Sequence, residues 1–285
     1  MNFGIIGTGV VGTALAVKLT QAGHTCVGVN TRSNQSYERF RSYLTADHLD
    51  LAQLLTKAEL LFITTQDGVI QSVAERMADL GPGLSGQLWI HCSGSLSSHI
   101  LKVRAEQPVR CLSVHPLQAF ADVPSALALI EGTHFGVEGE AVPEGERIVR
   151  ELGGIPHELH TAGKSLYHAG AVVASNYMVV LASLAVRLFA IAGIATDEAL
   201  ESLLPLMKGT LHNLGEVGLP KALTGPILRG DTEVIKGHLA QMPRDVANIY
   251  RGLGRETMEL GRAKLATAGL EYRPEVWSEL CSILE

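Results

Sequence analysis

Short apolar runs alternate with helical patterns through the first 160 residues, and this alternation limits the possible folds more than any other feature of the chain. Strands that alternate with helices form βαβ units, which pack into a mostly parallel sheet. The predicted strands span residues 2–7, 24–30, 59–65, 87–92, 110–114, 133–138 and 156–160. The predicted helices between them span residues 10–22, 49–57, 69–80 and 143–152. This part of the chain is therefore predicted to be an α/β domain.

The pattern changes after Thr161, where long apolar helical runs replace the alternation. Helices are predicted at residues 164–191, 196–215, 232–242 and 244–268. We therefore predict two domains, an α/β domain over residues 1–160 and an all-α domain over residues 161–285. Residues 169–195 are apolar enough to resemble a membrane span, but they include polar residues such as Asn176 and Arg187. A buried helix in a protein without a membrane partner is the favoured interpretation.

The composition argues against several classes of protein. The chain has 23 basic and 29 acidic residues, and its net charge of −6 is unlike the basic footprint of a general nucleic-acid binder. A hydrophobic content of 46% with 18% charged residues argues against disorder. The four cysteines form no CxxC pair and no zinc-binding spacing, and the N-terminal residues show no signal-peptide pattern. We therefore expect reduced thiols, a cytoplasmic location and no metal site.

A glycine-rich turn follows the first predicted strand and opens a predicted helix. It consists of Gly7, Thr8, Gly9, Val10, Val11 and Gly12. In a GxGxxG turn, the first glycine permits the tight turn, the second lets the backbone approach a pyrophosphate, and the third lets the helix pack against the strand. The uncapped N–H groups of the helix then face the phosphates. The turn predicts a dinucleotide site, and a turn without a ligand is the alternative.

The end of the second predicted strand indicates which dinucleotide binds. An NAD site usually has a carboxylate there to bind the ribose 2′-hydroxyl, but this strand ends in Asn30, Thr31, Arg32 and Ser33. Because Arg32 can pair with a 2′-phosphate and the adjacent hydroxyl groups can donate to it, we expect NADP(H). An Arg32 that lies solvated in a loop is the alternative.

Polar residues also follow other predicted strands, where a parallel sheet binds its ligands. Those expected to lie along the cofactor are Thr64, Thr65, Gln66, Ser93 and Gly94. His91 and His115 are candidate proton donors in the same region, and a structural role remains open for each.

The helical part carries further candidates. Lys164, His168, Ser175 and Asn176 lie at the start of a long apolar helical run, where polar side chains must find partners. Helical spacing places His168 and Ser175 on one face, with Asn176 at its edge. Farther along, Thr224 and Arg229 flank a Gly-Pro turn. Thr224 and Asp231 are capping residues of a connection between helices or, for Thr224, hold a substrate, and Arg229 either pairs with Asp231 or anchors an anionic substrate.

Taken together, these motifs resemble a family of predicted NADP oxidoreductases with an N-terminal Rossmann-like domain and a C-terminal helical domain. The matching segments are residues 7–12, 91–94, 115–120, 167–169, 175–177 and 222–231. The family is similar by fold to 6-phosphogluconate dehydrogenase, ketopantoate reductase and pyrroline-5-carboxylate reductase. This resemblance implies a nicotinamide site between the two domains and a homodimer joined through the helices.

The motifs and the resemblance together predict hydride transfer between NADPH and a carbonyl or imine carbon of a small metabolite. The candidate catalytic residues are His168, His115, Lys164 and Asn176, and the candidate substrate-binding residues are Ser175, Thr224 and Arg229. A non-catalytic protein that senses the state of the NADP pool is the alternative, because it needs the same glycine-rich turn.

Overall fold

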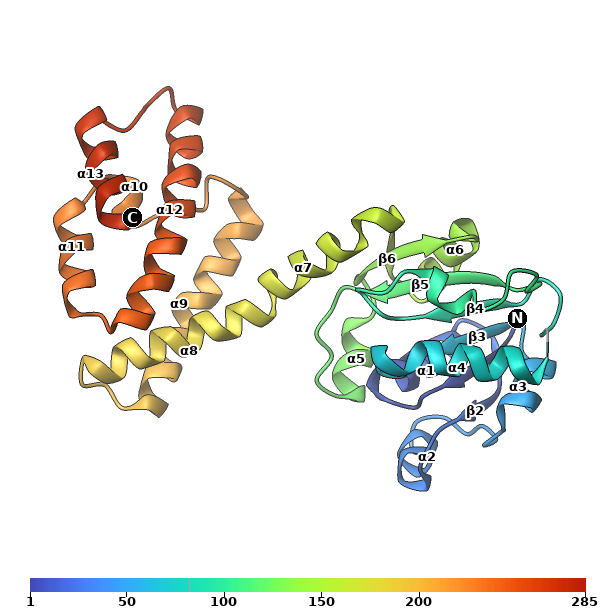
Figure 1. The fold of residues 1–285 in the computed structure, drawn as a ribbon. Coiled ribbons are helices and arrows are strands. Elements are labelled where there is room, and N and C mark those ends of the chain that lie inside the picture. Colours follow the sequence, from blue (N-terminus) through green and yellow to red (C-terminus); the bar gives the residue numbers. More distant parts are fainter. Residues whose placement is uncertain (82) are drawn as a thin grey trace. The chain divides into compact units, whose positions relative to one another are not determined.

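The contacts of the chain divide it into two compact units, Met1–Asn176 and Tyr177–Glu285 (Figure 1). The computed structural model describes residues 1–81 and 83–285. The sheet lies entirely in the first unit, and its last strand ends at Glu158. The first helix after it, α7 (Lys164–Ala174), is grouped with the sheet. The predicted domain boundary near residue 160 stays a prediction.

Seven strands form one mostly parallel sheet in the order β2-β1-β3-β4-β5-β6-β7. Their bounds are β1 (Asn2–Ile6), β2 (Thr25–Asn30), β3 (Leu60–Ile63), β4 (Leu88–His91), β5 (Arg110–Pro116), β6 (His134–Gly139) and β7 (Ile155–Glu158). Every neighbouring pair is parallel except β5 and β6. The predicted α/β class is therefore confirmed. The chain leaves β1 on one side to form β2 and on the other to form β3, so a ligand crevice is expected beyond the carboxyl end of β1.

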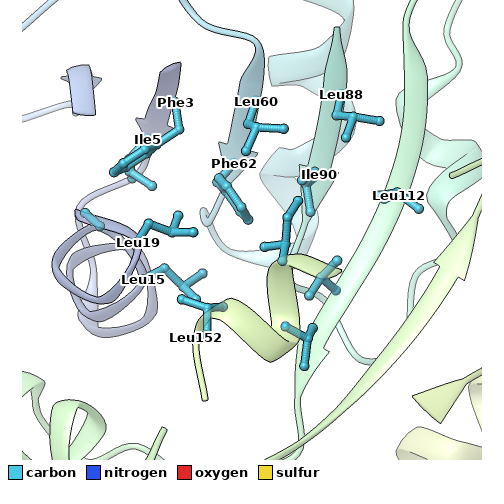
Figure 2. Close-up of a cluster of buried hydrophobic side chains, with 14 of the residues drawn as sticks. Phe3, Ile5, Leu15, Leu19, Leu60, Phe62, Leu88, Ile90, Leu112 and Leu152 are labelled. Atoms are coloured by element: carbon cyan, nitrogen blue, oxygen red, sulfur yellow. The ribbon is translucent and has the colours of Figure 1, made fainter. Parts of the chain in front are cut away.

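Helices cover both faces of the sheet, because alternate residues of each buried strand point to opposite sides. Leu60 and Phe62 of β3 pack with Leu15 and Leu19 of α1 (Val10–Gln21) in one cluster, shown in Figure 2. Leu61 and Ile63 join a second cluster on the opposite face. That face is covered by α3 (Leu51–Lys57) and α4 (Asp67–Leu80), whereas α6 (Val142–Glu151) shares the first face with α1.

Four α-helices escape the sequence-based prediction, α2 (Asn34–Arg41), α5 (Val123–Leu129), the single turn α10 (Pro226–Arg229) and α13 (Pro274–Leu284). The first two are short, and each offers few positions from which a period could be recognised: α2 buries only Phe40, and α5 buries Val123 and Ala126. Their caps are local instead: Ser33 accepts from the Ser36 N–H, and Asp122 accepts from the Ser125 N–H. Side-chain caps therefore define helices that hydrophobic periodicity does not reveal.

The second unit is helical throughout. It contains most of α8 (Asn176–Ile191) together with α9 (Thr196–Val217), α10 (Pro226–Arg229), α11 (Thr232–Gln241), α12 (Arg244–Thr267) and α13. Its core is formed by α10 to α13, through Ile227, Ile235, Met258, Leu280 and Leu284. Neither α8 nor α9 contributes a residue to that core.

The expected buried helix at residues 169–195 is not buried within this chain. The structure interrupts the run at Ser175, and α8 has no buried residue. The helical stretch Thr161–Ile191 is long and apolar enough to cross a membrane. None of the residues in its most apolar 18-residue segment is buried. The prediction was wrong because apolar periodicity identifies a helix face that requires cover without identifying what covers it.

Candidate functional site

The glycine-rich turn has the geometry that its spacing predicts. Gly7 adopts a φ of +102°, a conformation that favours glycine, and its N–H donates to Asn30 O at 2.8 Å. At Gly12, a Cβ atom would collide with Gly7 O and Thr64 Oγ1, so only glycine lets α1 approach the strand so closely. At Gly9, a Cβ would meet nothing within 4 Å. The turn is tight on the protein side and open on the other.

A cavity of about 600 Å³ lies over this turn. Ten of the predicted cofactor residues line it: Gly7, Thr8, Gly9, Asn30, Thr31, Arg32, Ser33, Thr64, Thr65 and Gln66. Val10, Val11, Gly12, Ser93 and Gly94 do not line it. The structure adds lining residues that sequence reasoning missed, Ile6, Ser36, Arg39, Leu51, Val69, Val73 and Arg76. They come mainly from α2 and α4, and no local motif connects these helices with the turn.

The lining of the cavity suits an anionic ligand. Three of the lining residues are arginines, and none of the described lining residues is an aspartate or glutamate. The hydroxyl oxygen of Thr65 is buried and has no hydrogen-bond partner within residues 1–81 and 83–285. A buried polar atom without a partner costs free energy unless a ligand or water satisfies it. The cavity therefore fits a phosphate-bearing molecule with further polar groups.

His91, at the carboxyl end of β4, has a structural role in this arrangement. Its Nε2 donates to Ser97 O at 3.1 Å, and its Nδ1 accepts from the Ser93 N–H at 3.1 Å. Because both partners are backbone groups of fixed polarity, the ring is neutral and both nitrogens are used. Burial, followed by the charge of Lys164, lowers the pKa of His91 to about 4. His91 is not available as a proton donor here.

The loop after β4 is fixed by a carboxylate at the start of α4. Asp67 accepts hydrogen bonds from the Ser93 hydroxyl at 2.7 Å and from the Ser95 hydroxyl at 3.0 Å. Gly94 lies between these serines in the sequence and close to two imidazole rings. A Cβ there would come within 2.7 Å of His168 Cδ2 and 2.8 Å of His115 Nε2. The absence of a side chain at residue 94 thus lets the loop lie directly against both histidines.

His115, on β5, pairs with a residue that sequence reasoning missed. The Tyr167 hydroxyl and Nδ1 of His115 share a hydrogen bond of 3.0 Å, and the rings of His115 and His168 are 6.3 Å apart. Burial, followed by the charges of Lys164 and His168, lowers the pKa of His115 to about 4. Two candidate proton donors, His115 and His168, are therefore brought together with Tyr167. Tyr167 lies in the segment 167–169 that carries the family resemblance, but no spacing connects it with His115.

Lys164 lies beneath this group and is only 1% exposed. Its ammonium group donates to the Ser113 hydroxyl, which in turn donates to Ser93 O at 3.2 Å. Burial lowers the pKa of Lys164 to about 8, and the nearby carboxylate of Glu138 opposes that shift. In this structure Lys164 is out of reach of a small molecule, so its predicted role as a proton donor lacks geometric support.

Glu138, on β6, is the buried carboxylate whose charge raises the pKa of Lys164 most. It accepts from the Ser98 N–H at 2.8 Å, the Ser98 hydroxyl at 2.9 Å and the Thr161 hydroxyl at 2.8 Å. Burial by itself would raise the pKa of Glu138, but these three hydrogen bonds and Lys164 hold it below its ordinary value. The cluster therefore contains both a buried cation and a buried anion.

The remaining candidates are not brought to this group by any contact. Ser175 is the C-cap of α7 and Asn176 begins α8, and neither side chain has a hydrogen bond among the described residues. Thr224 and Arg229 lie in the second unit, where Arg229 Nε donates to Asp231 at 2.8 Å. This ion pair is one of the two alternatives expected for Arg229, whereas neither α10 nor α11 has a side-chain cap in the part of the chain that the structure describes. The role of Thr224 and Arg229 in substrate binding stays a prediction. Among residues 1–81 and 83–285, no cluster of three metal-ligating side chains occurs.

Comparisons with solved structures support the architecture. A protein from Thermotoga maritima is 26% identical, with 90% of this chain and 98% of that chain covered and a TM-score of 0.70. A Bacteroides fragilis protein provisionally named an NADP oxidoreductase is 23% identical, with the same coverage and a TM-score of 0.71. A pyrroline carboxylate reductase from Plasmodium falciparum, solved with NADP bound, is 15% identical, with 92% and 98% covered and a TM-score of 0.56. No curated protein matches the chain.

Two family models match separate parts of the sequence. The model described as a Rossmann-like domain matches residues 1–116, which contain the glycine-rich turn and β1 to β5. The model described as a domain of unknown function, DUF2520, matches residues 133–257, which begin near β6 and continue into α12. The N-terminal part of the chain thus matches the Rossmann-like domain, and the part that follows matches DUF2520.

Proposed function

We propose that this protein is an NADP(H)-dependent oxidoreductase that transfers a hydride to or from a carbonyl or imine carbon of a small metabolite. The cavity over the glycine-rich turn carries this proposal, because it joins an open phosphate-binding turn to three arginines without a carboxylate. The NADP bound to the similarly folded Plasmodium reductase supports the choice of cofactor. The four free thiols are in keeping with a cytoplasmic location.

Residues of the first unit would hold the cofactor. Backbone N–H groups at Gly9 and the start of α1 would receive the pyrophosphate, because α1 has no side-chain cap. Arg32 and Ser33 would receive a 2′-phosphate, and the unpaired Thr65 hydroxyl would gain a polar partner. When bound, the nicotinamide supplies or accepts the hydride.

His115 and His168 would act on the carbonyl oxygen or imine nitrogen of the substrate. A neutral imidazole polarises a carbonyl or imine by donating a hydrogen bond, and His115 is held neutral at physiological pH. With the Tyr167 hydroxyl donating to Nδ1, the ring proton lies on Nε2, the nitrogen that lies beside Gly94. His168 would then provide the proton, and Ser175 and Asn176 would contact the substrate. A contact of Thr224 or Arg229 with the substrate stays a prediction.

Nucleotide binding tests the choice of cofactor. We expect calorimetry to show tighter binding of NADPH than of NADH. Arg32→Ala should weaken NADPH binding by roughly 1–3 kcal/mol, because a charge-assisted contact is lost, with a smaller effect on NADH. Arg41→Ala is the matched control, since Arg41 lies on α2 and pairs with Glu38 outside the cavity. Equal dissociation constants for the two cofactors in the unaltered protein would refute the proposed preference.

Turnover separates an enzyme from a sensor. An enzyme should oxidise NADPH in the presence of at least one member of a panel of ketones, aldehydes and cyclic imines. His168→Ala should reduce that rate without weakening NADPH binding, because His168 does not line the cofactor cavity. Tight NADPH binding without turnover of any member would instead favour a non-catalytic sensor.

A further inference from the structure

The arginines of the first unit fall into two groups. Five of its eight arginines form ion pairs with carboxylates. These pairs are Arg41–Glu38, Arg104–Asp79, Arg110–Glu144, Arg147–Glu151 and Arg150–Glu146. Arg32, Arg39 and Arg76 have no carboxylate partner among the described residues, and all three line the cavity over the glycine-rich turn. The unpaired arginines of this unit are thus the ones that face the cavity.

These three arginines reach the cavity from separate elements. Arg32 follows β2, Arg39 lies on α2, and Arg76 lies on α4. Like charges that surround one cavity repel each other, and an anionic ligand with more than one charged group relieves this repulsion. A pyrophosphate alone carries its charge at one place, beside the turn. The distribution of the arginines therefore calls for a second anionic group away from the pyrophosphate.

Arg39 is positioned by contacts between α2 and the turn. Its Nη2 donates to Thr8 O at 3.3 Å, and the Thr8 hydroxyl donates to Ser36 O at 3.3 Å. The Ser33 hydroxyl caps α2 by accepting from the Ser36 N–H at 3.2 Å. The guanidinium group is thereby held between the turn and the segment of Arg32, with further N–H groups that have no partner in residues 1–81 and 83–285.

Arg76 has a different environment. It lies on the same face of α4 as Val69 and Val73, seven and three residues earlier, and all three line the cavity together with Leu51. An apolar wall of this kind suits a flat base, and a guanidinium group stacks on such a ring without requiring a phosphate. Arg76 is therefore suited to the adenine rather than to a charged group.

We propose that Arg39 is a second cationic ligand, beside Arg32, of the phosphate on the adenosine 2′-oxygen, and that Arg76 contacts the adenine. This assignment rests on the proposed NADP(H) function. It makes Arg39 a determinant of the preference for NADP over NAD, whereas Arg76 contributes equally to both.

Two small nucleotides that differ only in the 2′-phosphate test the role of Arg39. Adenosine 2′,5′-bisphosphate carries the 2′-phosphate and AMP does not, and neither contains a pyrophosphate. The full chain should bind the bisphosphate more tightly than AMP. Arg39→Ala should lower its affinity for the bisphosphate by about 10-fold or more and leave that for AMP nearly unchanged. Arg39→Lys should retain part of the preference, because the charge remains but the paired donors are lost.

Matched variants complete the test. Arg76→Ala should weaken both nucleotides by the same factor, and Arg41→Ala should change neither, because Arg41 lies on α2 outside the cavity. Thermal unfolding should show that all variants keep the fold.

Three results would overturn the assignment. They are an unchanged affinity of Arg39→Ala for the bisphosphate, an equal loss for both nucleotides in that variant, or a selective loss of the bisphosphate in Arg76→Ala. If the unaltered protein binds neither the bisphosphate nor NADPH, the proposed function fails together with this assignment. If the unaltered protein prefers the bisphosphate and Arg39→Ala keeps that preference, only the assignment fails.

Discussion

Individual polar residues at the carboxyl edge of the sheet differ in what they are free to do. Both ring nitrogens of His91 bond to the backbone, so this histidine fixes the loop that follows β4. His115 uses Nδ1 for Tyr167 and keeps Nε2 beside Gly94. Lys164 reaches the same loop from below through Ser113. A buried ammonium thus lies under a histidine that it helps to keep uncharged.

The charge of Lys164 should be measurable at His115. Lys164→Met removes a nearby cation, so the pKa of His115 should rise from about 4 by about 0.5 or more. NMR titration of the imidazole resonances measures this change. Lys57→Met, an exposed position on α3, is the control and should leave the titration unchanged. A pKa of His115 that is the same in Lys164→Met and the unaltered protein would contradict the prediction.

The same histidines make stability depend on pH. His91 and His115 have a folded pKa of about 4 against an ordinary value of 6.5, so the unfolded chain binds more protons between these limits. The free energy of unfolding should therefore fall as the pH drops from 6.5 towards 4. In Lys164→Met this dependence should be weaker, because the folded pKa of His115 lies nearer the unfolded one.

At the scale of elements, the first turn of α1 shows how packing and ligand space are divided between glycines. Gly12 lies against Gly7 O and Thr64 Oγ1, on the protein side of the turn. Gly9 has extended backbone angles and open space around the position of a Cβ. One glycine is therefore required by the packing of the fold, whereas packing within the chain does not require the other.

Alanine should lower stability at residue 12 and weaken NADPH binding at residue 9. Gly12→Ala should lower the free energy of unfolding by about 1–3 kcal/mol, because the methyl group overpacks the contact between α1 and β3. Gly9→Ala should leave stability nearly unchanged and weaken NADPH binding, because its methyl group occupies the open space. Denaturant unfolding and calorimetry measure the two quantities. Similar profiles for both variants would argue against this division.

At the scale of the whole molecule, apolar helix faces remain uncovered in the second unit. Val179 on α8 is 70% exposed and Leu206 on α9 is 67% exposed, although the core of this unit lies among α10 to α13. Large exposed apolar patches usually mark an interface. We propose that a second copy of the chain covers α8 and α9 in a homodimer.

Sedimentation tests the homodimer. The protein should sediment at twice 30.4 kDa at micromolar concentration in buffer without detergent. Val179→Lys and Leu206→Lys should shift it towards the monomer, because a lysine is costly to bury in an apolar interface. Leu270→Lys is the control, since Leu270 is 57% exposed but lies between α12 and α13. A stable monomer would reject the homodimer, and recovery only with detergent or vesicles would point to a membrane surface.

The sequence by itself determined the features that depend on neighbouring residues. The βαβ alternation, the roles of Gly7 in the turn and Gly12 in packing, and the lack of a carboxylate after β2 are each contained in a short stretch of chain. Local geometry and hydrophobic period are set by such stretches, so they can be recognised without a structure.

Only the tertiary structure decided which distant residues meet. His115 and Tyr167 are 52 residues apart, Ser113 and Lys164 are 51 apart, and Thr8 and Arg39 are 31 apart. The same holds for α2, whose short capped sequence lacks an apolar period but positions Arg39 beside the turn. Periodicity and spacing describe one element at a time, whereas a contact between elements depends on how the sheet orders its strands and on which helix faces become buried.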